Sequence, residues 1–77
     1  MEKVLVGRVY KHFKGDEYLL EGIATDCEDL ESVVIYRSLY GDGKVWVRKL
    51  SDFTSYKGDI KRFTLTEIES KKVENEK

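Results

Sequence analysis

The chain has 77 residues, of which 40% are apolar and 12% aromatic, so we expect one small domain with a thin core. Its 14 basic and 15 acidic residues give a formal net charge of -1, which excludes a large single-sign field for polyanions or anionic membranes. Cys27 is the only cysteine, and no apolar run is long enough for a signal sequence or a membrane span. We therefore expect a cytoplasmic protein without export or membrane insertion.

The first predicted unit is a β-hairpin. Residues 7–13 alternate in polarity and are rich in β-branched and aromatic types, which is typical of a strand. A Lys-Gly-Asp turn at residues 14–16 leads into a second strand that ends near Thr25. Gly22, inside this second strand, predicts a bulge or a close backbone approach.

A second hairpin is predicted after an acidic loop. Residues 26–32 carry four carboxylates and no strand pattern, so the chain leaves the sheet there. Residues 32–40 then begin with apolar side chains on both phases, which is typical of a central strand covered on both faces. The Gly-Asp-Gly sequence at 41–43 separates this strand from another at 44–48, and Asp-Gly between β-rich segments strongly indicates a hairpin.

The last third of the chain predicts a turn, a short strand and a tail. Residues 50–53 break the alternation, and we expect a 3₁₀ turn that places Phe53 in the core. A second Lys-Gly-Asp turn precedes a short strand within residues 60–66. Residues 67–77 are highly charged, which predicts a frayed helix or a disordered tail.

Together these elements predict a mainly β fold. The expected architecture is a small SH3-like barrel of four to five antiparallel strands, with a short 3₁₀ turn and a flexible C-terminal tail. The barrel domain would occupy residues 1–66 and the tail residues 67–77. An irregular meander sheet is the alternative.

Several short motifs resemble a known family pattern. In chain order they are Tyr10-Lys11-His12-Phe13-Lys14-Gly15, Tyr18, Gly22-Ile23-Ala24, Val33-Val34-Ile35-Tyr36, Leu39-Tyr40-Gly41, Trp46-Val47-Arg48, Phe53 and Phe63. Over residues 7–65 this pattern resembles the bacterial domain-of-unknown-function family numbered 1653, which implies no established activity. Members usually carry a His-Ser pair where this chain has Asp26-Cys27, and a proline where it has Lys49. The first difference removes a second imidazole, which argues against a mechanism that needs two.

The function that the sequence favours is a non-enzymatic binding module for a protein segment or a small polar ligand. The candidate ligand-binding residues are His12, Lys14, Tyr18, Glu28, Tyr36, Tyr40, Trp46 and Arg48. They combine hydrogen-bond donors with aromatic rings on predicted hairpins, which suits an anion or an extended peptide. The alternative for His12 is a bond to a neighbouring strand or to the acidic loop. The alternative for Trp46 and Tyr36 is that they form the core.

Two other functions remain open. Basic residues between 44 and 62, interleaved with aromatic rings, would suit nucleic acid, but residues 1–66 carry 11 basic and 11 acidic residues. A small enzyme with His12 and Glu28 as a proton-transfer pair is the third hypothesis. One histidine and one cysteine lack paired ligand spacing, so no metal or cofactor is expected. Open sheet edges would permit a homodimer.

Overall fold

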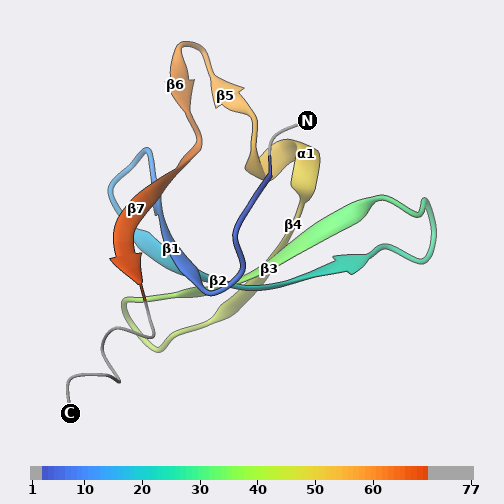
Figure 1. Cartoon of the computed structure of the whole chain (residues 1–77), viewed down its shortest axis with the longest axis horizontal. Helices are drawn as coiled ribbons and strands as arrows, with labels where there is room; N and C mark the ends of the chain where they lie inside the picture. Colours follow the sequence, from blue (N-terminus) through green and yellow to red (C-terminus); the bar gives the residue numbers. More distant parts are fainter. Residues whose placement is uncertain (1–2, 70–77) are drawn as a thin grey trace.

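An antiparallel sheet of five strands, in the order β4-β3-β2-β1-β7, dominates the structure (Figure 1). This computed structural model describes residues 3–69, except for the side chains of residues 68 and 69. The strands of the sheet are β1 (Arg8–His12), β2 (Glu17–Thr25), β3 (Ser32–Ser38), β4 (Val45–Lys49) and β7 (Phe63–Glu69). Between β4 and β7 the chain forms α1 (Leu50–Phe53) and a small hairpin of β5 (Tyr56–Lys57) and β6 (Ile60–Lys61).

Both hairpins predicted from the turn residues are confirmed. β1 pairs with β2, and β3 pairs with β4, each in antiparallel register. The turns place Gly15 at φ +111° and Gly43 at φ +69°, which are backbone conformations that glycine adopts without steric cost. The β2–β3 register shifts between Leu20 and Gly22, so the bulge predicted at this glycine is also confirmed.

The central position of β3 is confirmed, because it lies between β2 and β4. Only one of its faces is fully covered. Val34 and Tyr36 are buried on the inner face, whereas Val33 and Ile35 on the outer face are half-buried. A chain of this length covers the inner face well and leaves the outer face of the sheet partly exposed to water.

The core is a group of aromatic rings on the inner, concave face of the sheet. Phe53 from α1 stacks on Phe63 from β7 with ring centroids 4.1 Å apart and an interplanar angle of 7°. The edges of Tyr10 and Tyr36 meet Phe53 at 5.4 and 5.5 Å. Both phenylalanines are at most 2% exposed, and burying one such side chain stabilises the fold by about 1.5–3 kcal/mol.

The prediction of an SH3-like barrel was wrong, because the sheet stays open. β4 and β7 are its two edges and do not pair with each other. Side chains occupy the space between them, where the guanidinium of Arg48 from β4 lies 5.6 Å from the ring centroid of Phe63 from β7. The two edge strands therefore approach through bulky side chains, and their backbones stay too far apart for hydrogen bonds.

Two further expectations are refined by the structure. The helical turn that buries Phe53 is α-helical, because the Thr54 amide donates to the carbonyl of Leu50 at 3.0 Å. β7 continues to Glu69, and the rest of the predicted tail, residues 70–77, lies outside the described residues. The described part of the chain contains no helix with the length and apolarity that a membrane span requires.

Candidate functional site

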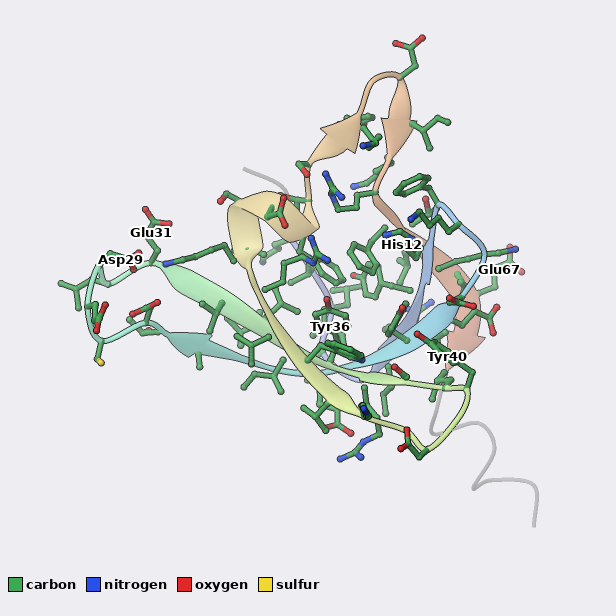
Figure 2. All side chains as sticks on the ribbon, turned by 180° about the vertical axis from the view of Figure 1, so that it is seen from behind. His12, Asp29, Glu31, Tyr36, Tyr40 and Glu67 are labelled. Carbon is green, nitrogen blue, oxygen red and sulfur yellow. The ribbon has the colours of Figure 1, made fainter. Side chains whose placement is uncertain are left out.

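Aromatic and cationic side chains from several elements converge at one end of the concave face. Figure 2 shows three of them, His12, Tyr36 and Tyr40, on the same side of the molecule. We call this group the aromatic–cationic cluster. Its members are His12, Lys14, Tyr18, Tyr36, Tyr40, Arg48, Arg62 and Phe63.

The buried ring of Phe63 is the centre of this cluster. The imidazole of His12 meets it edge-on at 4.9 Å, because the two residues are directly paired between β1 and β7. The rings of Tyr36 and Tyr18 approach it at 5.5 and 5.8 Å. The guanidinium of Arg48 lies over the same ring, so four of the polar candidate residues contact this one apolar side chain.

Arg48 and Arg62 share one carboxylate. Arg48 donates from Nε to the Tyr36 hydroxyl at 3.1 Å and from Nη1 to Asp52. Arg62 Nε lies 3.8 Å from the other carboxylate oxygen of Asp52 and donates to the Ser55 hydroxyl at 3.1 Å. Burial alone would lower the pKa of Arg48, but its bonds to Tyr36 and Asp52 outweigh this and raise it. The two guanidiniums are thus held in fixed positions.

His12 lies at the edge of the cluster in a positive environment. Its Nδ1 accepts a hydrogen bond from the Lys14 amide at 3.2 Å, so this nitrogen is unprotonated in that contact. Burial lowers the pKa of His12, and the charges of Arg48, Lys14 and Arg62 lower it further, while Asp16 opposes them. The imidazole is therefore neutral at pH 7.

Two tyrosine hydroxyls border the cluster. Those of Tyr18 and Tyr40 lie 3.1 Å apart, and either can donate to the other. Burial is the largest cause that raises the pKa of Tyr18, and this hydrogen bond is the second, so the hydroxyl stays protonated at neutral pH. Tyr40 is 46% exposed, which brings its hydroxyl to the surface next to that of Tyr18.

The charges that act on His12 do not cancel. Arg48, Lys14 and Arg62 all lower the pKa of His12 and Asp16 opposes them, while Asp52 pairs with both arginines. Protonation of His12 would add a further positive charge to this group. A partly desolvated group of this kind favours a small anion, since guanidinium and imidazolium N–H groups make their strongest hydrogen bonds to carboxylate and phosphate oxygens.

Trp46 lies beside the cluster and outside it. It faces Tyr36 in the β3–β4 pairing and donates from Nε1 to the Ser38 hydroxyl at 2.8 Å. Its side chain is 43% exposed, while Tyr36 is only 5% exposed. Tyr36 is therefore a core residue whose hydroxyl accepts a hydrogen bond from Arg48 in the cluster. Trp46 is a surface residue of the edge strand.

Glu28 is the candidate that the structure separates from the others. It lies in the acidic loop between β2 and β3, where its amide donates to Asp26 at 2.8 Å. Asp29 of the same loop and His12 lie at opposite ends of the molecule (Figure 2). The proposed proton-transfer pair of His12 and Glu28 does not converge, so the hypothesis built on it loses its support.

The acidic loop forms its own charged group around Lys49. The lysine bonds Asp29, and its Nζ lies 3.2 Å from Asp26 and 3.9 Å from Glu31. This lysine is the main cause that lowers the pKa of Asp29, whereas for Asp26 the amide of Glu28 is the larger cause. An open cavity of about 340 Å³ lies next to this charged group, and its lining includes Glu31, Ser32, Leu50 and Ser51.

Sequence reasoning missed three parts of these groups. Asp52 was not recognised as the shared partner of Arg48, although their four-residue separation is a common ion-pair spacing in turns of helix. Arg62 was assigned only to a basic patch, and Phe63 only to the inner face of the last strand and to the rings interleaved with that patch. Within residues 3–69, no group of three His, Cys, Asp or Glu side chains is arranged to hold a metal ion.

Comparisons with known proteins agree with the motifs in the strands. A model of the family described as a protein of unknown function, DUF1653, matches residues 8–65. The crystal structure of a DUF1653 protein from Bordetella bronchiseptica is similar, with 32% sequence identity and a TM-score of 0.68 over 80% of this chain and 87% of that chain. No curated protein matches. Because the match runs from β1 into β7 and covers more than half of the chain, the chain belongs to the DUF1653 family.

Proposed function

We propose that this protein is a non-enzymatic module that binds a small anionic ligand at the aromatic–cationic cluster. The observation that carries the proposal is the convergence of His12 and Arg48 on the ring of Phe63, with Lys14 and Arg62 close enough to lower the pKa of His12. Carboxylates and phosphate monoesters fit this chemistry. A ligand with a planar apolar part would also contact the exposed face of Trp46 and the ring of Tyr40.

Nucleic acid is a weaker fit for the same residues. Arg48 and Arg62 are paired with Asp52, and Lys49 is paired with the acidic loop. Lys49 therefore belongs to the acidic loop and not to the cluster, so the basic residues suggested by the sequence do not form the continuous track that a polyphosphate chain requires, whereas a small anion needs only the cluster.

Binding is tested by following backbone amide shifts while inorganic phosphate, benzoate or neutral benzamide is added. We expect phosphate and benzoate to shift the amides of His12, Lys14 and Arg62, and benzamide to leave them unchanged. Lys14→Gln should weaken anion binding about three- to tenfold, while Lys57→Gln, at an exposed lysine of β5, should not. Absent shifts at tens of millimolar, or equal effects of both variants, would refute the proposal.

The pH dependence gives an independent check. The pKa of His12 in the folded protein is lowered, so the unfolded chain takes up this proton more readily. Stability should fall as pH drops below about 6.5 and level off below the folded pKa.

A bound anion favours the imidazolium, so benzoate should raise the His12 pKa and bind more tightly at about pH 5.5 than at about pH 8. A His12 pKa that ignores saturating benzoate contradicts the proposal.

A further inference from the structure

The outer edge of β4 offers unpaired backbone groups. β4 is the terminal strand of the sheet, and within residues 3–69 no other strand pairs with its outer side. The amide of Ser38 bonds the carbonyl of Lys44 at 2.9 Å, and bonded pairs alternate along an antiparallel ladder. Trp46 and Arg48 therefore bond to β3. The N–H and C=O groups of Val45 and Val47 and the N–H of Lys49 face outward, whereas the carbonyl of Lys49, the N-cap residue of α1, accepts the first bond of that helix.

The side chains of this edge are unusually apolar for a strand exposed to water. Val45, Trp46 and Val47 are 47%, 43% and 65% exposed. The β3–β4 register shows no bulge, and β4 contains no proline, so two common protections against edge pairing are absent from this strand. Val47 is paired with the half-buried Ile35, so its exposed surface continues an apolar outer face.

We propose that β4 pairs in antiparallel fashion with β4 of a second copy of this chain. A two-fold axis at Val47 places Val45 opposite Lys49 of the second copy. All residues with outward-facing backbone groups then lie opposite one another, which is the condition for bonded pairs. The same register sets Trp46 opposite Arg48 of the second copy on the concave side of the joined sheet.

Charge complementarity selects this occupant over an unrelated apolar strand. At one end of β4, Asp26, Asp29 and Glu31 surround the single positive charge of Lys49, so this end is net negative. The exposed Lys44 lies just before the other end of the strand. Antiparallel pairing brings Lys44 of each copy towards the acidic loop of its mate. The strand is therefore complementary to itself in charge as well as in hydrogen bonding.

The first test is sedimentation equilibrium of the wild-type chain from about 10 µM to about 1 mM, the range expected for an interface smaller than standard size. We expect a reversible dimer that weakens as salt rises. Val47→Lys, which sets like charges opposite each other on the two-fold axis, should raise the dissociation constant about tenfold or more, and Val47→Thr should not. A monomer at every concentration overturns the proposal. This holds even if the edge of β4 binds a different protein.

A cross-linking test fixes the register. In a Cys27→Ser background, Val47→Cys should form an interchain disulfide under mild oxidation, because the two sulfurs meet on the axis. Val45→Cys, on the same face of the same strand, is the matched control. Its two copies would lie four residues apart along the strand, about 13 Å, which is beyond disulfide reach. Equal cross-linking of both variants, or faster cross-linking of Val45→Cys, rejects this register.

Discussion

Arg48 and Lys49 are neighbours in β4, yet they serve two very different charged groups. Successive residues of a strand point to opposite faces, so Arg48 turns to the aromatic core and Lys49 to the acidic loop. Arg48 bonds the buried Tyr36 hydroxyl and covers Phe63, while Lys49 meets exposed carboxylates. Both side chains are ion-paired. Only Arg48 also bonds a buried group, the Tyr36 hydroxyl, which would otherwise need water as its partner. Burial, more than the number of ion pairs, should decide how much each contributes.

The largest effect should come from removing the apolar base of the cluster. Phe63→Ala deletes a ring that is 2% exposed and stacked on Phe53, and the cavity should cost about 3–5 kcal/mol. In a domain of this size that loss approaches the whole free energy of unfolding. Leu65→Ala, in the same strand but 40% exposed, is the control and should cost much less. Urea denaturation measures both, and equal losses would show that Phe63 is not the centre of the core.

An intermediate effect is expected at Arg48. Arg48→Met keeps much of the apolar stem but removes the donors to Tyr36 and Asp52, which should cost about 1–3 kcal/mol. Tyr36→Phe removes only the hydroxyl and should cost about 1 kcal/mol. A double-mutant cycle in urea denaturation separates their coupling from the individual losses. Strict additivity would mean that the Arg48–Tyr36 bond contributes nothing to the cluster.

The smallest effect is expected at Lys49. Lys49→Met removes ion pairs that are exposed to solvent, so the urea midpoint should change less than for Arg48→Met, and only at low salt. The lowered pKa values of Asp26 and Asp29 mean that their contribution is present above about pH 4 and is lost as pH falls through the folded values. NMR titration of the variant should show the Asp29 pKa rising towards its ordinary value. A larger loss than for Arg48→Met would reverse the comparison.

Local sequence patterns were sufficient for the elements themselves. The Asp-Gly and Lys-Gly-Asp turns fix where the chain reverses, since glycine alone adopts their backbone conformations without strain. Alternation of residue types located β1 to β4, and Gly22 located the bulge. These signals act over a few residues, so they can be read without knowledge of the rest of the chain.

The site required contacts between distant positions. His12 meets Phe63 across fifty-one positions of sequence, and this pairing exists only because β7 returns to the free edge of β1. The carboxylate of Glu28 is a suitable partner for the imidazole of His12, but the loop that carries Glu28 lies at the other end of the sheet. Nothing in the composition of either segment distinguishes these two outcomes.

The sequence by itself determined β1 to β4, the turns between them, the order of the two main hairpins and the burial of Phe53. It did not predict the β5–β6 hairpin or the extent of β7. Only the tertiary structure decided that the sheet stays open, that Arg48 and Arg62 share Asp52, and that Trp46 lies on an edge strand of the described sheet. The physical reason is that barrel closure depends on whether β4 and β7 come within hydrogen-bonding distance. The stacked volume of Phe53 and Phe63, together with the Arg48 guanidinium, keeps them apart, and that volume is a property of the packed core.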